Sequence, residues 1–285
     1  MRTFFKSKSG KISLPIFFPD ATRAVIKSLD TKDIESAKIP GILVNTFHLW
    51  QGLGGDVLEK FGGIRNFMGF DGGVISDSGG FQVMSVIKSG TVKGKITDEG
   101  VIFHPTKKTK KILTPEKSIE FQMKLRTDMV VVLDDFTDPK SSYEEAKDSV
   151  ERTIAWAKRS KREFEKLCKA KKMNKEEKPY ILGVVQGGKY QDLRKYCTRQ
   201  LSEIGFDGLG YGGWPICDDG SFDYESAKTI AQNSPPDYFL YGLVVLKRDE
   251  IVVINKMGFN IFDCVLPTRY LRHRRLYVCN FDSTD

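Results

Sequence analysis

The stretch SDSGGFQ at Ser76–Gln82 directly follows a short apolar run, GVI at Gly73–Ile75. This order predicts a buried strand that ends in a tight glycine turn. Two adjacent glycines let the backbone approach a ligand closely. The turn also carries a carboxylate, a hydroxyl, an aromatic ring and an amide, which together suit the holding and deprotonation of a flat polar ring. An ordinary strand-to-helix turn capped by Asp77 or Ser78 explains the same residues. Other segments of the sequence are therefore needed to distinguish a ligand site from a structural turn.

Eight short apolar segments recur along the chain, each followed by polar or glycine residues and then by a longer, mostly helical stretch. Alternating strands and helices indicate a parallel sheet, and eight such units indicate a closed (β/α)8 TIM barrel of the α/β class. The main rival is a doubly wound open sheet, but the chain has no GxGxxG fingerprint of a dinucleotide fold. The predicted strands are Leu14–Phe18, Gly41–Val44, Val74–Ile75, Met129–Leu133, Tyr180–Val185, Gly208–Tyr211, Tyr238–Leu240 and Asn260–Phe262.

Three of the intervening stretches have clear helix signals. Ser142–Glu145 is a capping box, Thr114–Lys117 places a cap residue before a first-turn proline, and Tyr190–Ile204 has an amphipathic pattern. A chain of 285 residues can bury one large core, and barrels of this length are commonly single domains. We therefore expect residues 1–285 to form one TIM-barrel domain.

The composition argues against several classes of protein. No apolar run approaches the ~18 residues of a membrane span, and the amino-terminal stretch lacks the apolar core of a signal peptide. The five cysteines are scattered and form no CxxC pair, which argues against a disulfide framework or a zinc knuckle. We expect a reduced, cytoplasmic protein that contacts no membrane.

The formal net charge is +8, and the basic residues gather in several clusters. Such clusters are usually just solvated faces, but several of them on one chain favour a polyanionic partner. The clusters lie at Lys107–Lys111, Lys158–Arg162, Lys169–Lys175 and Arg269–Arg275.

Three aspartates, Asp77, Asp134 and Asp263, each follow a different predicted strand. Because the carboxyl ends of barrel strands meet at one face, these carboxylates are expected to share a pocket. Any one of them alone fits a helix N-cap, but buried carboxylates are costly unless they are paired or used, which favours a function for the set. A nucleophilic carboxylate with a carboxyl acid/base is the standard arrangement for substitution at the anomeric carbon of a sugar.

Metal ligation is the competing use of an aspartate cluster. The three histidines, His48, His104 and His273, are far apart in the sequence, and no HExxH or DxD spacing accompanies them. We therefore expect neither a metal nor another cofactor.

Six short sequence blocks occur in the order NTFHLW at Asn45–Trp50, DSGGFQ at Asp77–Gln82, TPEKSIE at Thr114–Glu120, GVVQGG at Gly183–Gly188, IGFDG at Ile204–Gly208 and FDCVLPTR at Phe262–Arg269. In this order they resemble the signature blocks of the tRNA-guanine transglycosylase (queuine tRNA-ribosyltransferase) family. The resemblance runs from about Leu14 to Arg275. It implies a (β/α)8 barrel that exchanges a guanine in tRNA for a 7-deazaguanine.

The resemblance implies a mechanism with two carboxylates. Asp263 would attack the ribose C1′ of the target guanosine, releasing guanine and leaving a covalent nucleotide on the carboxylate. Asp77 would then take a proton from the incoming 7-deazaguanine, whose ring nitrogen displaces Asp263. Two inversions give net retention, as in a retaining glycosidase.

The resemblance also implies how the base is recognised. Asp134 would accept from the ring N–H and the exocyclic amine of guanine, which adenine cannot offer. Gln186 and the backbone N–H of Gly213 would bind the carbonyl edge, and leaving such groups unpaired would reject the wrong base. Phe81 and Tyr241 would sandwich the ring.

The remaining site residues concern the sugar and the phosphates. Ser78 and Asn45 are expected to bind near the ribose or to support the carboxylates. Arg269 and Arg272 would hold the flanking phosphates. The target base has to leave its stack at a cost of a few kcal/mol, so a strained tRNA loop is a natural substrate.

The chain departs from the family pattern in two ways. Most members carry a structural zinc bound by a CxCxxC run and a later histidine, whereas Cys279 stands alone here. We therefore expect a barrel shortened at its carboxyl end, without the zinc subdomain or the final helix, and the family's dimer contacts are in doubt. Asp20–Thr22, Trp214–Pro215 and Leu243–Leu246 also differ from the usual pocket loops, which would alter the base or the nucleic acid accepted.

Three other functions stay open at this point. A homologous enzyme that inserts 7-deazaguanines into DNA would share the chemistry. A non-catalytic RNA-binding subunit that supports a separate catalytic chain is the second, although such a subunit has little need for Asp77 and Asp263. An unrelated barrel hydrolase is the third. The sequence leaves open which base is inserted, and whether the chain acts alone, as a homodimer or with a partner subunit.

Overall fold

The computed structural model describes residues 2–243 and 247–275, and its centre is a sheet of eight parallel strands. The strands pair in the order β3-β13-β12-β11-β10-β9-β5-β4. A bridge between Asp20 and Leu43 joins the two ends of this order, and the N–H of Ala21 donates to the carbonyl of Leu43 at 2.7 Å. The predicted (β/α)8 barrel is confirmed, and the open sheet is not observed among the described residues. The strands are β3 (Ile16–Pro19), β4 (Gly41–Asn45), β5 (Gly73–Asp77), β9 (Met129–Val131), β10 (Tyr180–Val185), β11 (Gly208–Tyr211), β12 (Phe239–Gly242) and β13 (Ile261–Cys264).

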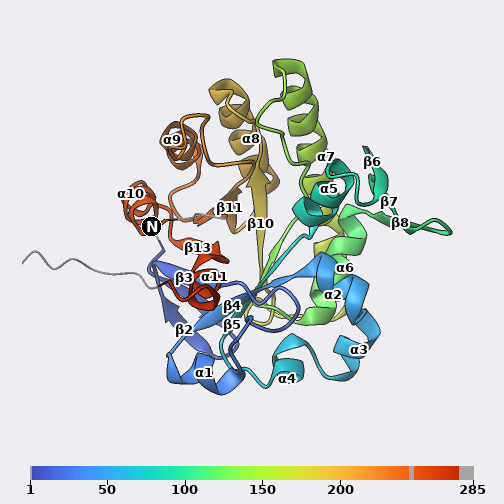
Figure 1. Ribbon diagram of the computed structural model, residues 1–285, viewed down its shortest axis with the longest axis vertical. Helices are drawn as coiled ribbons and strands as arrows, with labels where there is room; N and C mark the ends of the chain where they lie inside the picture. Colours follow the sequence, from blue (N-terminus) through green and yellow to red (C-terminus); the bar gives the residue numbers. More distant parts are fainter. Residues whose placement is uncertain (1, 244–246, 276–285) are drawn as a thin grey trace, which may run out of the picture.

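Helices cover the outside of the barrel (Figure 1). The predicted capping box is present, since the hydroxyl of Ser142 accepts from the N–H of Glu145 while its own N–H donates to the Glu145 carboxylate. Thr114 caps the predicted helix that begins at Pro115, and this proline lies in its first turn. Within the described residues, no helix combines the length and apolar character needed to span a bilayer. The helices are α1 (Thr31–Ser36), α2 (Thr46–Gly52), α3 (Gly55–Lys60), α4 (Ile64–Met68), α5 (Gly80–Lys88), α6 (Pro115–Leu125), α7 (Tyr143–Ala170), α8 (Gln191–Ile204), α9 (Tyr224–Asn233), α10 (Arg248–Lys256) and α11 (Leu266–Arg272).

Two small antiparallel sheets lie outside the barrel. A hairpin of β1 (Phe4–Ser7) and β2 (Gly10–Ser13) precedes the first barrel strand. The other sheet, of β6 (Lys93–Thr97), β7 (Gly100–Thr106) and β8 (Thr109–Leu113), projects from the barrel beside α5 (Figure 1). A short helix, α11, follows the last strand, and Cys279 lies outside the described residues.

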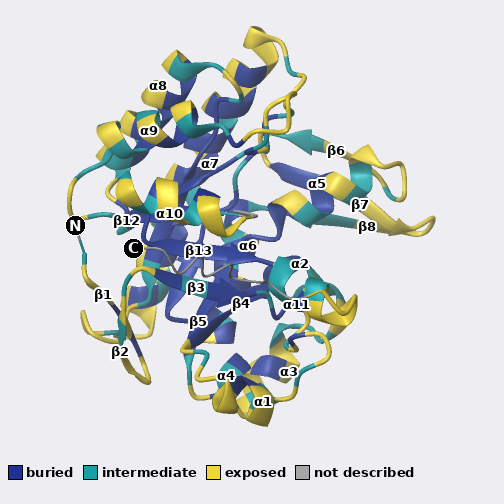
Figure 2. Cartoon of the chain, turned by 60° about the vertical axis from the view of Figure 1, so that its left-hand side comes forward, coloured by how far each residue is buried: buried dark blue, intermediate teal, exposed yellow. Residues whose placement is uncertain are grey.

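The core has an inner and an outer layer because successive residues of a strand point to opposite faces. In β10, Leu182 and Val184 join the interior cluster of the barrel, whereas Ile181 and Val185 join the cluster beneath the helices. The strands are therefore buried on both faces, and the exposed residues lie on the outer sides of the helices and on the projecting sheet (Figure 2). This alternation decides which residue at each strand end faces the barrel axis.

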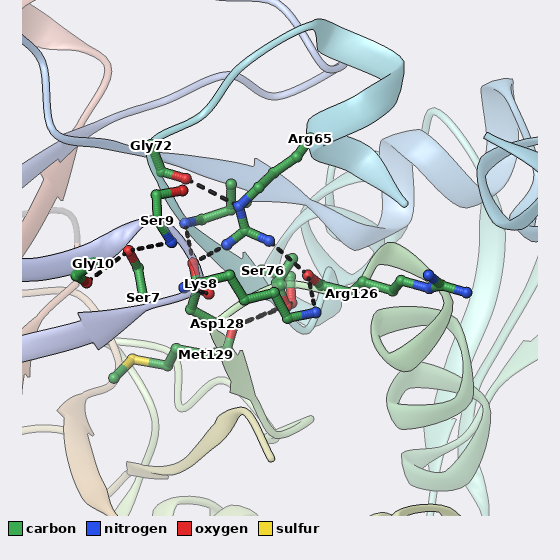
Figure 3. Close-up of polar contacts among 12 residues, drawn as sticks. Ser7, Lys8, Ser9, Gly10, Arg65, Gly72, Ser76, Arg126, Asp128 and Met129 are labelled. Carbon is green, nitrogen blue, oxygen red and sulfur yellow. Dashed lines mark hydrogen bonds and ion pairs between the residues drawn. The ribbon is translucent and has the colours of Figure 1, made fainter. Parts of the chain in front are cut away.

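At the amino ends of the strands, a buried ion pair fixes the hairpin to the barrel (Figure 3). The carboxylate of Asp128 pairs with the guanidinium of Arg65 and accepts from the N–H groups of Lys8 and Val74, each at 2.8 Å. Arg65 also donates to the carbonyl of Arg126 at 2.8 Å. This ion pair lies at the end of the barrel opposite to the carboxyl ends of the strands.

Candidate active site

A cavity of about 260 Å³ opens at the carboxyl ends of the barrel strands. Loops after β3, β5, β9, β11, β12 and β13 contribute to its wall. Six of the predicted site residues line it, and they are Asp77, Ser78, Phe81, Asp134, Gly213 and Asp263. The structure thus brings together residues that are up to 186 positions apart in the sequence, 263 − 77.

Asp77 faces the cavity because it lies two residues after the inward-facing Ile75 of β5. Asn45 donates through Nδ2 to its Oδ2 at 2.6 Å, and the N–H groups of Thr46 and Gly79 donate to Oδ1 at 3.0 and 3.1 Å. Asn45 thereby supports a carboxyl group, which is one of the two roles considered for it. The oxygen of the Asn45 amide, Oδ1, accepts from the N–H of His48 at 3.0 Å and so caps α2.

Burial raises the pKa of Asp77 to about 8, and the negative charges of Asp20 and Asp263 contribute to this shift. The hydrogen bonds that Asp77 accepts act in the opposite direction but do not cancel the effect. At neutral pH this carboxyl therefore carries a proton that it can donate.

Asp263 uses the same alternation on β13, since it lies two residues after the inward-facing Ile261. It is buried, with 6% of its surface exposed. Its charge contributes to the raised pKa values of both Asp77 and Tyr241, which shows that the three side chains are close together. Two carboxyl groups from strands far apart in the sequence thus share one end of the cavity.

Asp134 follows β9 and is held by Gln186, which follows β10. The Nε2 of Gln186 donates to Asp134 Oδ2 at 2.6 Å, while its Oε1 accepts from the N–H of Thr137 at 3.1 Å. Because that N–H can only donate, the amide has one possible orientation. Burial raises the pKa of Asp134 to about 7, and the negative charge of Asp135 adds to the shift.

Arg194, which the sequence analysis did not identify, joins the end of β10 and its loop to the loop after β11. Its Nη1 donates to the carbonyls of Val185 and Gly212 at 3.1 and 2.8 Å, and its Nε donates to the carbonyl of Gly188 at 2.9 Å. The side chain is almost completely buried, at 1% exposed. Its place on the buried side of α8, three residues before Cys197, is the signal that indicates an internal role.

The cavity has an aromatic wall. Phe81 is 40% exposed at the start of α5, and its ring packs edge-on against Phe136 with centroids 5.0 Å apart. Gly79, two residues before Phe81, has φ +75°, and a Cβ there would lie 2.5 Å from the backbone nitrogen of Phe47. Only glycine fits this turn. Trp214, noted above as a departure from the family pattern, forms another part of the wall.

Tyr241 lies elsewhere than the predicted sandwich requires. It pairs in register with Ile261, two residues before Asp263, so its ring belongs to the layer beneath the cavity. The side chain is fully buried within the barrel interior and is not part of the cavity wall. Leu243, two residues further along, lines the cavity instead. In this structure the ring of Tyr241 therefore lies in the barrel interior, beneath the cavity.

Arg269 and Arg272 lie on α11, which begins three residues after Asp263. Both side chains are exposed, and neither lines the cavity. Arg272 donates to the carbonyl of Thr268 at 3.2 Å. The two arginines stand outside the cavity on the element that directly follows the buried carboxylate.

The family resemblance raises the question of a structural zinc ion. Within residues 2–243 and 247–275, no three histidine, cysteine, aspartate or glutamate side chains come together in a way that could hold a metal ion. The described residues therefore do not fit a bound zinc ion.

The fold and the cavity define a (β/α)8-barrel protein with a carboxylate-lined pocket at the end of the barrel where such folds carry their active sites. The model of the family Queuine tRNA-ribosyltransferase matches residues 2–283. The chain belongs to this family, which confirms the resemblance seen in the sequence.

Curated relatives of the same name agree with this assignment. The Staphylococcus haemolyticus protein is 35% identical over 268 residues, which are 93% of this chain and 66% of the relative. The Thermotoga maritima protein is 38% identical over 269 residues (94% and 69%), and the Vibrio cholerae protein is 36% identical over 270 residues (94% and 68%). The chain spans about two thirds of the length of these relatives.

Proposed function

We propose that this protein is a tRNA-guanine transglycosylase, a pentosyltransferase that exchanges a guanine in tRNA for a 7-deazaguanine such as queuine or its precursor. The observation that carries the proposal is the placement of Asp77 and Asp263 at one end of the cavity, together with the Asp134–Gln186 pair in the same cavity. The first pair suits chemistry at a sugar carbon, and the second suits recognition of a purine edge. Membership of the family supports the same reaction.

In the first step, Asp263 attacks C1′ of the target nucleotide. The bond between C1′ and the ring nitrogen of guanine breaks as the bond between C1′ and the carboxylate oxygen forms. The leaving guanine needs a proton, and Asp77 has one to give because its pKa is raised to about 8.

In the second step, a 7-deazaguanine enters the place left by guanine. Asp77, now ionised, takes the proton from its ring nitrogen, and that nitrogen displaces Asp263 from C1′. The two displacements restore both carboxyl groups to their initial states and retain the configuration at C1′. Asp77 therefore serves as acid and then as base, and no other proton donor is required.

Recognition of the base rests on Asp134 and its neighbours. When ionised, Asp134 accepts from both the ring N–H and the exocyclic amine of guanine, which favour the charged form once they are bound. Gln186 and the N–H of Gly213 serve the carbonyl edge of the ring. Adenine presents a mismatched edge and leaves these buried groups unpaired, which rejects it.

The walls of the cavity hold the faces of the ring. Phe81 provides a stacking surface, worth about 1–3 kcal/mol for one base. Leu243 and Trp214, which also line the cavity, complete the enclosure in the place for which Tyr241 had been predicted. The target base reaches this cavity only after it has left its stack in the tRNA.

The tRNA backbone binds outside the cavity. We infer that Arg269 and Arg272 contact the phosphates that flank the target nucleotide, because they lie exposed on α11 directly after the strand of Asp263. The net charge of +8 and the exposed lysines of the β7–β8 turn favour the same polyanionic partner. The free cysteines of the described residues fit the reducing cytoplasm in which tRNA is modified.

The experiment that tests the proposal is incorporation of labelled guanine into unmodified tRNA and, in parallel, into duplex DNA. Asp263→Asn is the control variant. Label that enters tRNA, and does so only with an intact Asp263, is the expected result. Label that enters DNA alone would assign the chain to DNA modification, and no label in either would refute catalysis by this chain.

A further inference from the structure

Asp20 places a third carboxylate beside the pair that the proposed reaction uses. It directly follows β3, which pairs with β13 so that Phe18 is opposite Asp263 and Pro19 is opposite Cys264. On its other side, Asp20 bridges to Leu43 of β4. The residue therefore lies at the seam where the barrel closes, next to the end of the strand that carries Asp263, and it lines the same cavity.

Burial raises the pKa of Asp20, and hydrogen bonds from Thr22 and the charge of Lys27 offset this effect only in part. The hydroxyl of Thr22 donates to Oδ1 at 2.8 Å. No lysine, arginine or histidine within the described part of the chain lies within ion-pair distance of it. A partly buried carboxylate without a cationic partner is costly unless a ligand uses it.

The position of Asp20 within the cavity shows which part of a substrate it meets. Its charge contributes to the raised pKa values of Asp77, Tyr241 and Cys264, all at the end of the cavity where the sugar reacts. It does not contribute to the pKa shift of Asp134, which recognises the base. Asp20 therefore faces the sugar.

The sugar of a polynucleotide offers one group that suits this carboxylate. Its 3′ and 5′ oxygens are esterified within the chain and have no proton to donate, and the phosphates repel a carboxylate. The 2′-hydroxyl is the only sugar donor, and it sits on the carbon next to C1′, the atom that Asp263 attacks. DNA lacks this group.

We propose that Asp20 accepts a hydrogen bond from the 2′-hydroxyl of the nucleotide whose base is exchanged, and so makes the reaction specific for RNA. The inference rests on the proposed function, because it assumes that Asp263 attacks C1′. It gives Asp20 a contact with the substrate next to the reacting atom. It also supplies a physical reason for a carboxylate in a loop where the family pattern is neutral.

The test combines a change in the protein with a change in the substrate. Labelling first locates the exchanged guanosine, and a second tRNA is then made with 2′-deoxyguanosine at that position alone. The value of kcat/KM for exchange is measured on both tRNAs with wild type, Asp20→Ala and Asp20→Asn. Asp138→Ala is the matched control, since Asp138 is half-exposed, pairs with Lys88 at 2.9 Å and lies outside the cavity wall.

We expect wild type to prefer the ribose substrate by about 10- to 100-fold, the range for a hydrogen bond to a charged group. Asp20→Ala should lose this factor on the ribose substrate and show no preference between the two tRNAs. Asp20→Asn retains an acceptor oxygen and should keep part of the preference, while Asp138→Ala keeps all of it. If Asp20→Ala does not fold, Asp20→Leu, which fills a similar volume without an acceptor, takes its place.

Two results would overturn the inference, and they differ from failure of the proposed function. An undiminished preference in Asp20→Ala, or equal rates of wild type on both tRNAs, would show that Asp20 does not contact the 2′-hydroxyl although exchange occurs. Absence of exchange by wild type on the ribose tRNA would instead refute the proposed function and the inference with it.

Discussion

The two ends of the barrel bury carboxylates in different ways, and the amino end does so with full compensation. There, Asp128 accepts from the N–H groups of Lys8 and Val74 and forms a buried ion pair with Arg65 (Figure 3). Only 2% of the Asp128 side chain is exposed, and 12% of that of Arg65. Donors and a cation surround the charge, so this end joins the hairpin, α4 and the barrel into one stable unit.

At the carboxyl end, Asp77 also accepts three hydrogen bonds, but within the described residues no cation forms an ion pair with it. Its charged neighbours are Asp20 and Asp263, which raise its pKa further. The comparison shows that accepted hydrogen bonds hold a carboxyl in place at either end, whereas burial without a cationic partner, reinforced by two negative neighbours, lets Asp77 keep its proton. One end is arranged for stability and the other for chemistry, as the barrel fold permits.

The largest expected effect is loss of the covalent adduct in Asp263→Asn. The amide cannot act as the nucleophile, so we expect kcat/KM for guanine exchange to fall by about 10⁴-fold or more. The fold should be retained, because the variant is similar in shape and removes a negative charge from a cluster of them. Trapped adduct on a denaturing gel and labelled guanine incorporation are the measurements.

Asp138→Asn is the matched control for this experiment. It makes the same chemical change in a half-exposed carboxylate paired with Lys88, and exchange should be unaffected. An adduct that persists in Asp263→Asn would assign the nucleophile to another residue. The carboxyl end of the barrel would then not owe its chemistry to Asp263.

At the amino end, Arg65→Ala should cost stability and leave the chemistry intact. Removal of one member of a buried ion pair leaves the other charge uncompensated, and we expect the free energy of unfolding to fall by about 3–5 kcal/mol. Lys124→Ala is the control, because Lys124 pairs at 2.8 Å with Asp56, whose side chain is 88% exposed; exposed pairs contribute about 0–1 kcal/mol. Urea unfolding measures the stability of both variants. Equal losses of unfolding free energy would contradict the view that the Arg65–Asp128 pair stabilises the fold more than the exposed pair does.

The raised pKa of Asp77 predicts how stability and activity depend on pH. Its ordinary value is 3.8 and its folded value is about 8, so between these values the folded state binds more protons than the unfolded state. The contribution of Asp77 to stability is thus present below about pH 4 and is lost as the pH rises toward 8. Adduct formation should also decline above about pH 8, because Asp77 then has no proton to give.

Asp77→Asn tests both parts of this prediction. The variant should gain stability relative to wild type as the pH rises from 4 to 8.5, and its residual adduct formation should lose the alkaline decline. Unfolding curves and single-turnover rates at each pH provide the data. A stability difference that stays constant over this range would mean that Asp77 is ionised in the folded protein.

The barrel could be predicted from the sequence because its strands are buried on both faces. Segments such as Tyr180–Val185 therefore read as continuous apolar runs, and each is followed by polar residues. The same regularity predicted that Asp77 and Asp263 would meet. The projecting sheet was not predicted, since Lys93 and Lys95 of β6 interrupt any apolar run.

Two features of the site depend on three-dimensional packing that a single sequence does not display. The position of Arg194 on the buried side of α8 indicates an internal side chain, but the sequence does not show that it bonds carbonyls of two separate loops. Tyr241 follows the alternation of β12, but only its register against Ile261 shows that its ring lies beneath the cavity. Local pattern predicts which strand a residue follows, whereas the layer it occupies depends on the stagger between strands.

The smallest expected effect concerns Arg269 on α11, which belongs to neither of the two carboxylate clusters compared above. Arg269→Ala removes an exposed charge, so we expect tRNA affinity to fall several-fold and the slope of log Kd against log salt to decrease by about 1. Lys256→Ala changes an exposed charge in the last turn of α10, outside the named basic clusters, and serves as the control. Neither variant should alter stability or the rate of adduct formation at saturating tRNA, because neither side chain lines the cavity. An unchanged salt slope in Arg269→Ala would refute its contact with phosphate and would direct the search for the tRNA surface to the lysines of the projecting sheet.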